Sequence, residues 1–153
     1  MITGSNANLL SGKLATLLSG RYVEIKLYPL SFKEFLQAKN IDPQSRMAEQ
    51  LYREYEQYGT FPSVVLSDER LKDTILSGIF DSIVLNEIAY RANVKDTQTL
   101  KSVIAFLADN VGQLVNPNKI SNTLTSERIS TTNHTINKYL ELLENAFLFY
   151  KAQ

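Results

Sequence analysis

The chain has 153 residues, of which 44% are hydrophobic, enough for one medium domain or two small ones with modest cores. Its 16 basic and 16 acidic side chains cancel, so no sequence-wide field draws it to nucleic acid or to an anionic membrane, and any DNA contact has to be local. It has no cysteine, which excludes disulfide and thiolate chemistry, and its single histidine, His134, argues against a histidine-based metal site.

Nothing in the sequence resembles a signal peptide, and no apolar run approaches the roughly 20 residues that a membrane-spanning helix needs. The cytoplasm is therefore the expected location.

The first third predicts a helix, a strand and a second helix. Leucines recur at helical spacing up to Gly20, which accepts the left-handed geometry of a helix end. In residues 23–27, apolar and charged side chains alternate, as in a half-buried strand. Ser31, with Glu34 three positions later, predicts a capping box at the start of the next helix.

The middle of the chain predicts two further helices. Asp42 and Pro43 are typical of a helix start, and that helix is expected to run to about Tyr58, before Gly59. Its tyrosines favour core or half-buried packing over an interface. A longer helix over residues 69–93 carries a wide apolar face, which indicates core rather than a cofactor site.

The last third predicts three helices joined by short connections. Asp96 caps the first, which Gly112 ends; Asn116 and Pro117 open the second; Ser130 opens the third. The apolar stretch 147–150 follows. This order is typical of a winged helix-turn-helix that stops at its first wing strand.

These elements predict a mainly α fold with minor β. We expect a boundary near Ser67, between a lid-like first part, residues 1–66, and a helical second part, residues 67–153. The winged-helix element begins at about residue 96. The two parts could also pack as one unit.

Several short sequence blocks follow one another along the chain. They are Thr3-Gly4-Ser5-Asn6, Gly20-Arg21, residues 23–27, Pro29-Leu30-Ser31-Phe32-Lys33-Glu34-Phe35, Gly59-Thr60-Phe61-Pro62-Ser63-Val64-Val65 and Ser82-Ile83-Val84-Leu85-Asn86-Glu87-Ile88. Together they resemble the bacterial and archaeal AAA-superfamily P-loop ATPases that carry a C-terminal domain of unassigned function. The similarity spans the whole chain, and the block at Pro29 is the most specific. Asn86-Glu87 stands where the family usually has Arg-Asp, which weakens any role inferred there.

The resemblance implies a C-terminal fragment of such an ATPase. The fragment would hold a remnant of the P-loop ATPase sheet with its nucleotide sensor, then a helical region and a truncated winged helix-turn-helix. The intact parent would bind ATP with Mg²⁺ and couple hydrolysis to movement of the helical part. Its partners would be the missing N-terminal half of the ATPase domain and, at the winged helix, a protein or DNA. A homo-oligomer is compatible with this reading, and no membrane partner is expected.

Residues 4–13 contain a glycine and a Gly-Lys pair but do not form a phosphate-binding P-loop. Seven residues separate the glycines where the motif needs four, and Leu14 follows Lys13 where a Ser or Thr would reach Mg²⁺. No apolar strand ends in the acidic residues of a Walker B motif. We therefore expect no ATP hydrolysis by this chain alone.

The candidate nucleotide site lies at the start of the chain. The resemblance makes Thr3, Ser5 and Asn6 the γ-phosphate sensor of the intact parent, although the same residue types suit a turn that caps the next helix. Arg21 is the candidate catalytic residue, since a guanidinium there would stabilise charge on a transferring phosphoryl group. The alternative for Arg21 is a surface salt bridge at a helix end.

A candidate nucleic-acid site lies at the start of the third C-terminal helix. Its residues are Thr132, Asn133, His134, Asn137 and Lys138. In a DNA-binding winged helix these positions face base edges, where asparagine pairs with adenine and lysine meets phosphate. Residues 96–153 hold five basic and five acidic side chains, a balance that argues against strong binding. The competing hypothesis for the whole chain is therefore a non-enzymatic winged-helix module that binds DNA or a protein.

Overall fold

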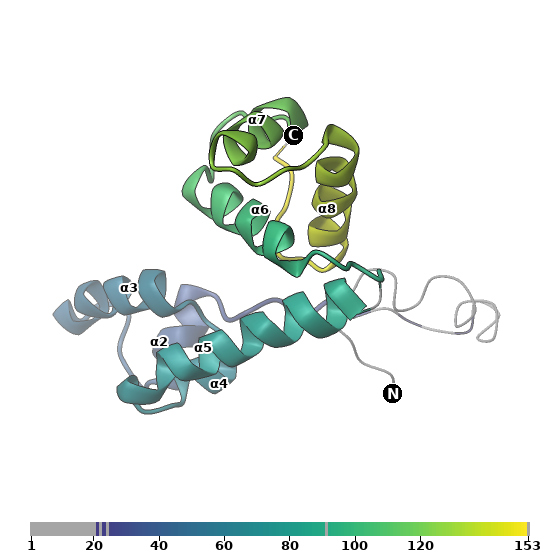
Figure 1. The fold of residues 1–153 in the computed structure, drawn as a ribbon. Coiled ribbons are helices and arrows are strands. Elements are labelled where there is room, and N and C mark those ends of the chain that lie inside the picture. The colour runs from purple at the N-terminus through teal and green to yellow at the C-terminus, as the bar shows by residue number, and fades with distance from the viewer. Residues whose placement is uncertain (1–20, 22, 24, 91, 153) are drawn as a thin grey trace. The chain divides into compact units, whose positions relative to one another are not determined.

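The structure is a computed structural model that describes residues 21, 23, 25–90 and 92–152, with the backbone alone for Glu87. In chain order its helices are α2 (Phe32–Ala38), α3 (Arg46–Tyr58), α4 (Pro62–Val65), η2 (Glu69–Leu71), α5 (Lys72–Asp81), η3 (Ser82–Tyr90), α6 (Thr97–Asp109), α7 (Pro117–Ser126) and α8 (Asn133–Asn145) (Figure 1). The expectation of a mainly α fold is confirmed. The leucine-rich helix predicted before Gly20 lies outside the described residues.

The described part of the chain contains no strand, so the minor β expectation is not met there. Val23 and residues 25–28 have no regular structure, and neither does the predicted first wing strand over residues 147–150. A strand needs a neighbouring strand to bond its backbone N–H and C=O groups, and an isolated two-stranded hairpin is already marginal in water. The described residues supply neither segment with such a neighbour. A sheet remnant and a winged helix are therefore not seen here.

The chain divides into two compact units, with the division after Asp81. One unit, within residues 22–81, contains α2, α3, α4, η2 and α5; we call it the α2–α5 unit. The other contains η3 and the three C-terminal helices within residues 82–152; we call it the α6–α8 unit.

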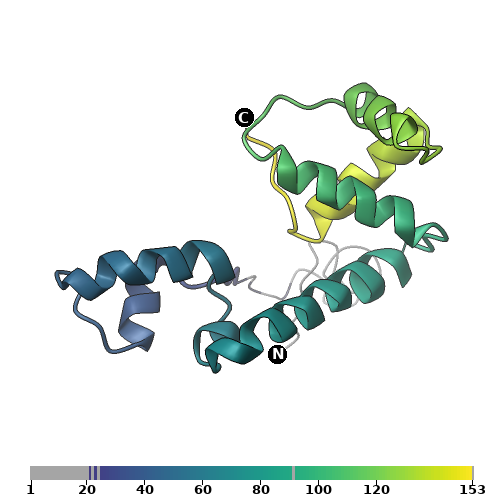
Figure 2. The same cartoon turned by 60° about the vertical axis from the view of Figure 1, so that its left-hand side comes forward.

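The α2–α5 unit begins with the predicted capping box. The Ser31 hydroxyl accepts a hydrogen bond from the Glu34 N–H, and the Glu34 carboxylate accepts from the Ser31 N–H at 2.8 Å, so two amides at the helix start are satisfied. Helix α2 packs on α3 (Figure 2). Their shared core holds Phe35, Leu36, Ala48 and Val65, with Leu30, Phe32, Ile41, Leu51 and Tyr55 packed around it.

Helix α3 starts later than the sequence predicted. Its N-cap is Ser45, whereas the Asp42 carboxylate accepts a hydrogen bond from the Gln44 N–H at 2.9 Å and closes a local turn. Aspartate favours such side-chain turns as strongly as helix caps, which explains the error. The predicted end is confirmed: Gly59 follows Tyr58 with a positive φ of 65°.

The long helix predicted over residues 69–93 forms as three consecutive segments: the short 3₁₀ turn η2, α5 and η3. The last of these is a π-helix, whose hydrogen bonds run from residue i to i+5. Its buried residues Val84, Ile88 and Ala89 are spaced by four and five positions, as that wider helix requires. Leu85 and Tyr90 are exposed.

In the α6–α8 unit the three predicted helices pack on one another in all pairs (Figure 1). Asp96 caps α6 and Asn116 caps α7, both as predicted. Helix α8 is capped by Thr132 rather than opened by Ser130, and α6 ends at Asp109, before the predicted Gly112. The core between these three helices is aliphatic, with one aromatic ring; its most buried large side chains are Leu100, Val103, Ile120, Leu124, Ile136, Tyr139 and Leu143.

Several helices end in the same backbone motif, which sequence reasoning did not identify. After α2, η3, α7 and α8 comes a residue with positive φ that is not glycine: Asn40, Asn93, Arg128 and Phe147. The next residue donates its N–H back across five positions, as Ile129 does to Leu124 at 2.9 Å. This is the Schellman motif, in which an apolar residue after the turn packs on one in the last helical turn.

Candidate functional site

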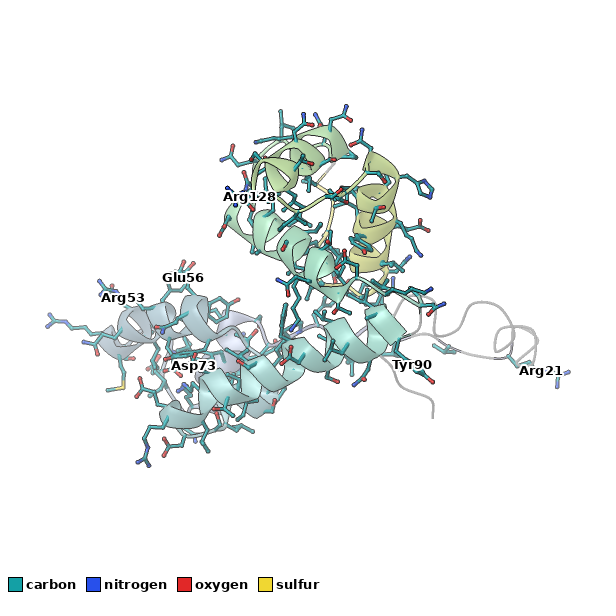
Figure 3. All side chains as sticks on the ribbon, in the orientation of Figure 1. Arg21, Arg53, Glu56, Asp73, Tyr90 and Arg128 are labelled. Atoms are coloured by element: carbon teal, nitrogen blue, oxygen red, sulfur yellow. The ribbon has the colours of Figure 1, made fainter. Side chains whose placement is uncertain are left out.

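The candidate nucleotide residues Thr3, Ser5 and Asn6 lie outside the described residues, so their prediction stays untested. Arg21 is described; it is exposed and belongs to no helix or strand (Figure 3). Exposure leaves its guanidinium accessible to a phosphate, and the role predicted for it also stays untested.

The segment after Arg21 carries an unusual apolar exposure. Val23, Ile25 and Leu27 are 88%, 77% and 90% exposed, although their alternation with charged residues is typical of a half-buried strand. Three such side chains within five residues form a run of exposed apolar surface, which is more informative than a single exposed residue. The described part of the chain therefore covers little of these three side chains.

At the start of α8, two of the five candidate residues make hydrogen bonds within the protein. The Thr132 hydroxyl accepts a hydrogen bond from the Thr135 N–H at 3.2 Å, which makes it the N-cap. Asn133 donates its side-chain amide to the side-chain oxygen of Asn118 on α7. This bond brings the first turns of α7 and α8 together.

The other three candidates, His134, Asn137 and Lys138, are exposed on α8. Asn118 and Lys119 on α7 are exposed as well, and the sequence did not single them out. The order of two helices joined by a short turn could have indicated them. In that order the first turns of α7 and α8 can come into contact, which places α7 side chains beside those of α8.

A second polar cluster was missed entirely: Lys39, Glu54 and Lys72 in the α2–α5 unit. Lys39 Nζ lies 2.8 Å from the Glu54 carboxylate, and Lys72 also bonds that carboxylate. The Lys72 side chain is 4% exposed, and its ammonium lies 5.0 Å from the centre of the Tyr58 ring. No local pattern joins residues so far apart in sequence, which is why sequence reasoning could not find them.

The ionic cluster sets the protonation state of its acid. Burial raises the pKa of Glu54, but the hydrogen bonds from Lys39 and Lys72 and the attraction of their charges together outweigh burial and hold that pKa below its ordinary value. Glu54 is therefore ionised at neutral pH and neutralises one of the two ammonium groups. The cluster ties the C-cap of α2, Lys39, to α3 and α5.

Metal ligands do not gather in the described part of the chain: no group of three or more His, Asp or Glu side chains there could hold an ion. None of the helices described is both long enough and apolar enough to cross a membrane.

Two family models match the chain. A domain of unknown function (DUF8612) matches residues 49–153, and an AAA domain matches residues 1–36. The first match covers most of the sequence, so the chain belongs to the DUF8612 family. The AAA match covers the candidate nucleotide residues and ends within α2.

Two curated relatives are uncharacterized proteins. One, from Haemophilus influenzae, is 80% identical over 153 residues, which is 100% of this chain and 38% of the relative. Another, from Methanocaldococcus jannaschii, is 32% identical over 157 residues, covering 97% of this chain and 36% of the relative. The chain thus spans little more than a third of the length of these relatives. No solved structure matches it.

Proposed function

We propose that this chain is part of an AAA-superfamily ATPase, in which ATP binding and hydrolysis drive movement of the helical region. The observation that carries the proposal is the AAA-domain match over residues 1–36, directly before the DUF8612 domain. The much greater length of both relatives leaves room for the remaining parts of an ATPase domain.

In this proposal Thr3, Ser5 and Asn6 sense the γ-phosphate, and Arg21 stabilises charge on the transferring phosphoryl group. ATP and Mg²⁺ are held mainly by a P-loop and an acidic strand, which this sequence does not contain. The exposure of Arg21 supports its role, because a guanidinium committed to the protein core could not reach a nucleotide.

The partner of the first 28 residues is then the rest of the ATPase domain. The exposed side chains of Val23, Ile25 and Leu27 support this, since strand pairing within a covered sheet would bury them. Helices α6, α7 and α8 would form the winged helix-turn-helix, with residues 147–150 as its first wing strand. Such an ATPase would work in the cytoplasm, as a monomer or as a homo-oligomer.

The test is ATP turnover by the whole Haemophilus influenzae relative and by the 153-residue chain. The relative is expected to release phosphate with Mg²⁺ present and the chain to release none. Replacing the relative's residue aligned with Arg21 by alanine is expected to slow release by about 10³-fold or more. The matched control replaces the residue aligned with Arg53, which is exposed on α3. An inactive relative, or equal rates for the two variants, would contradict the proposal.

A second candidate function is a non-enzymatic winged-helix module that binds DNA or a protein. The observation that favours it is the Asn133–Asn118 hydrogen bond, which joins the first turns of α7 and α8. This function requires neither Arg21 nor a nucleotide.

A further inference from the structure

We propose that the α2–α5 unit docks on the rest of the ATPase domain through three exposed apolar side chains, Tyr28, Phe61 and Leu66, called here the docking surface. The proposal rests on the proposed ATPase function for the identity of the partner. It goes beyond strand pairing in residues 23–28, because it assigns a contact to residues within the DUF8612 match. Through this contact, movement of the ATPase domain would reach the helical region.

Two uncharged segments meet at the docking surface. Residues 27–32 and 59–67 contain no Asp, Glu, Lys or Arg. The Leu30 N–H donates a hydrogen bond to the Thr60 carbonyl oxygen at 3.1 Å. This bond holds the two uncharged segments next to each other within one unit.

The apolar side chains of these segments are divided between the core and the surface. Val64 and Val65 are buried and fix the short helix α4 to the unit. Phe61 and Leu66, directly before and after α4, are 38% and 73% exposed, and Tyr28 is 72% exposed. Because α4 is anchored, the backbone that carries Phe61 and Leu66 is fixed before a partner binds, which reduces the entropy lost on binding.

The composition of the docking surface favours a protein partner. The centre of a protein interface is depleted in charged residues and enriched in tyrosine and phenylalanine, and its rim is polar. Asp68 and Arg70 form an exposed ion pair at 3.2 Å shortly after Leu66, where such a rim would lie. A nucleic acid needs basic side chains for its phosphates, and the two uncharged segments contain none.

The family matches indicate which protein is the partner. The AAA-domain match ends at residue 36 and includes Tyr28, whereas Phe61 and Leu66 lie in the DUF8612 match. The docking surface therefore begins in the segment that continues from the proposed ATPase domain. The chain spans 38% of the Haemophilus influenzae relative, so more than half of that protein lies outside it and can supply the partner. A second copy of the chain would need no such continuity.

The experiment measures how fast N-ethylmaleimide labels a cysteine placed at the docking surface. The chain has no cysteine of its own, so Leu66→Cys introduces one, and the same change is made at the aligned residue of the whole relative. Labelling of this site, followed by peptide mass spectrometry, is expected to be about tenfold or more slower in the relative, because a covered thiol reacts only when the interface opens. The matched control is Glu56→Cys, at an exposed position on α3, which should label at the same rate in both proteins.

A second pair of variants tests the docking surface itself. In the relative that carries the cysteine aligned with Leu66, serine at the residue aligned with Phe61 should speed labelling toward the rate of the chain. Serine at the residue aligned with Met47, which is 52% exposed on α3, should leave labelling slow. Circular dichroism checks that each variant keeps its helices.

Equally fast labelling of the cysteine at Leu66 in the chain and in the relative would overturn the proposal, as would equal slowing at both cysteine positions. So would labelling of the chain that slows as its concentration rises, which would make a second copy the partner. Neither readout requires ATP turnover. An inactive relative with a slowly labelled cysteine would contradict the proposed function alone, and an active relative with a rapidly labelled one would contradict only the docking.

Discussion

The two units of this chain keep their helices together by different means. The α2–α5 unit has a small apolar core, a cluster of aromatic rings and a largely buried ionic cluster. The α6–α8 unit relies on an aliphatic core and on helix caps. The stability lost when an aliphatic core side chain is truncated grows with the volume removed, whereas removing either partner of a buried ion pair leaves the other charge buried and unpaired. The first unit should therefore be fragile at few positions and the second moderately sensitive at many.

The largest effect is expected at Glu54. Glu54→Gln leaves the Lys72 ammonium buried without a counter-charge, which costs roughly 3–5 kcal/mol. Native-state hydrogen exchange should show that the loss of protection is confined to α2, α3 and α5. The matched control is Glu56→Gln: Glu56 is exposed on the same helix (Figure 3) and should change stability by less than about 0.5 kcal/mol. Equal effects of the two substitutions would contradict the claim that the ionic cluster stabilises the α2–α5 unit.

Acid should reproduce part of that effect. Because the pKa of Glu54 is lower in the folded chain than in the unfolded one, its ionisation adds stability that is fully present above the unfolded pKa. The stability is lost as pH falls through the lowered folded pKa. Protection of α3 should therefore fall with acidification, and Glu54→Gln should flatten this dependence. A variant that stays equally acid-sensitive would assign the sensitivity to other carboxylates.

In the α6–α8 unit the largest effect is expected from a cavity. Leu143 is fully buried on α8, and Leu143→Ala should cost about 3 kcal/mol of unfolding free energy, measured as loss of exchange protection in α6 and α8. Leu114 is 98% exposed, so Leu114→Ala is the matched control and should be close to neutral. A large effect of the control would mean that the loop before α7 is packed.

A smaller effect is expected at the α6 cap. The Asp96 carboxylate accepts a hydrogen bond from the Thr99 N–H at 2.9 Å, and Asp96→Ala should cost about 1 kcal/mol. Hydrogen bonds from the Thr99 side chain and N–H hold the pKa of Asp96 below its ordinary value, so this stability too is present above the unfolded pKa and lost in acid. Asp96→Asn should keep most of the cap without the pH dependence. Urea denaturation at two pH values would distinguish the three chains.

The smallest effect has the opposite sign. Arg128 has a φ of 66°, a left-handed geometry that costs a residue with a side chain about 1 kcal/mol. Arg128→Gly removes that cost but increases the freedom of the unfolded chain, so a net gain of about 0.5 kcal/mol is expected. Glu127 has an ordinary φ of −86°, and Glu127→Gly should destabilise instead. Thermal unfolding of the two variants would test whether the geometry of this turn is as described.

Local signals in the sequence predicted most helices. The Ser31–Glu34 capping box and the Asp96 and Asn116 caps are confirmed, because each depends on residues no more than three positions apart. The same reasoning failed where one residue type serves two local structures. Asp42 forms a turn rather than a cap for this reason.

Other features depended on contacts that no local pattern encodes. The ionic cluster joins residues on three helices, and the Asn118–Asn133 bond joins two. The alternation in residues 23–27 predicted a strand, but pairing needs a partner that periodicity cannot supply. The nucleotide roles of Thr3, Ser5 and Asn6 stay predictions because these residues lie outside the described part of the chain, and the role of Arg21 also stays a prediction.

The Schellman ends of α7 and α8 bear on how quickly this chain reaches its fold. Each fixes the exit direction of a helix with bonds that span only five residues, so neighbouring helices can be oriented before distant segments meet. Proteins dominated by such short-range contacts fold in microseconds to milliseconds, whereas long-range pairing slows the search. On refolding of the whole chain, these helix ends should thus become ordered before contacts between distant segments form.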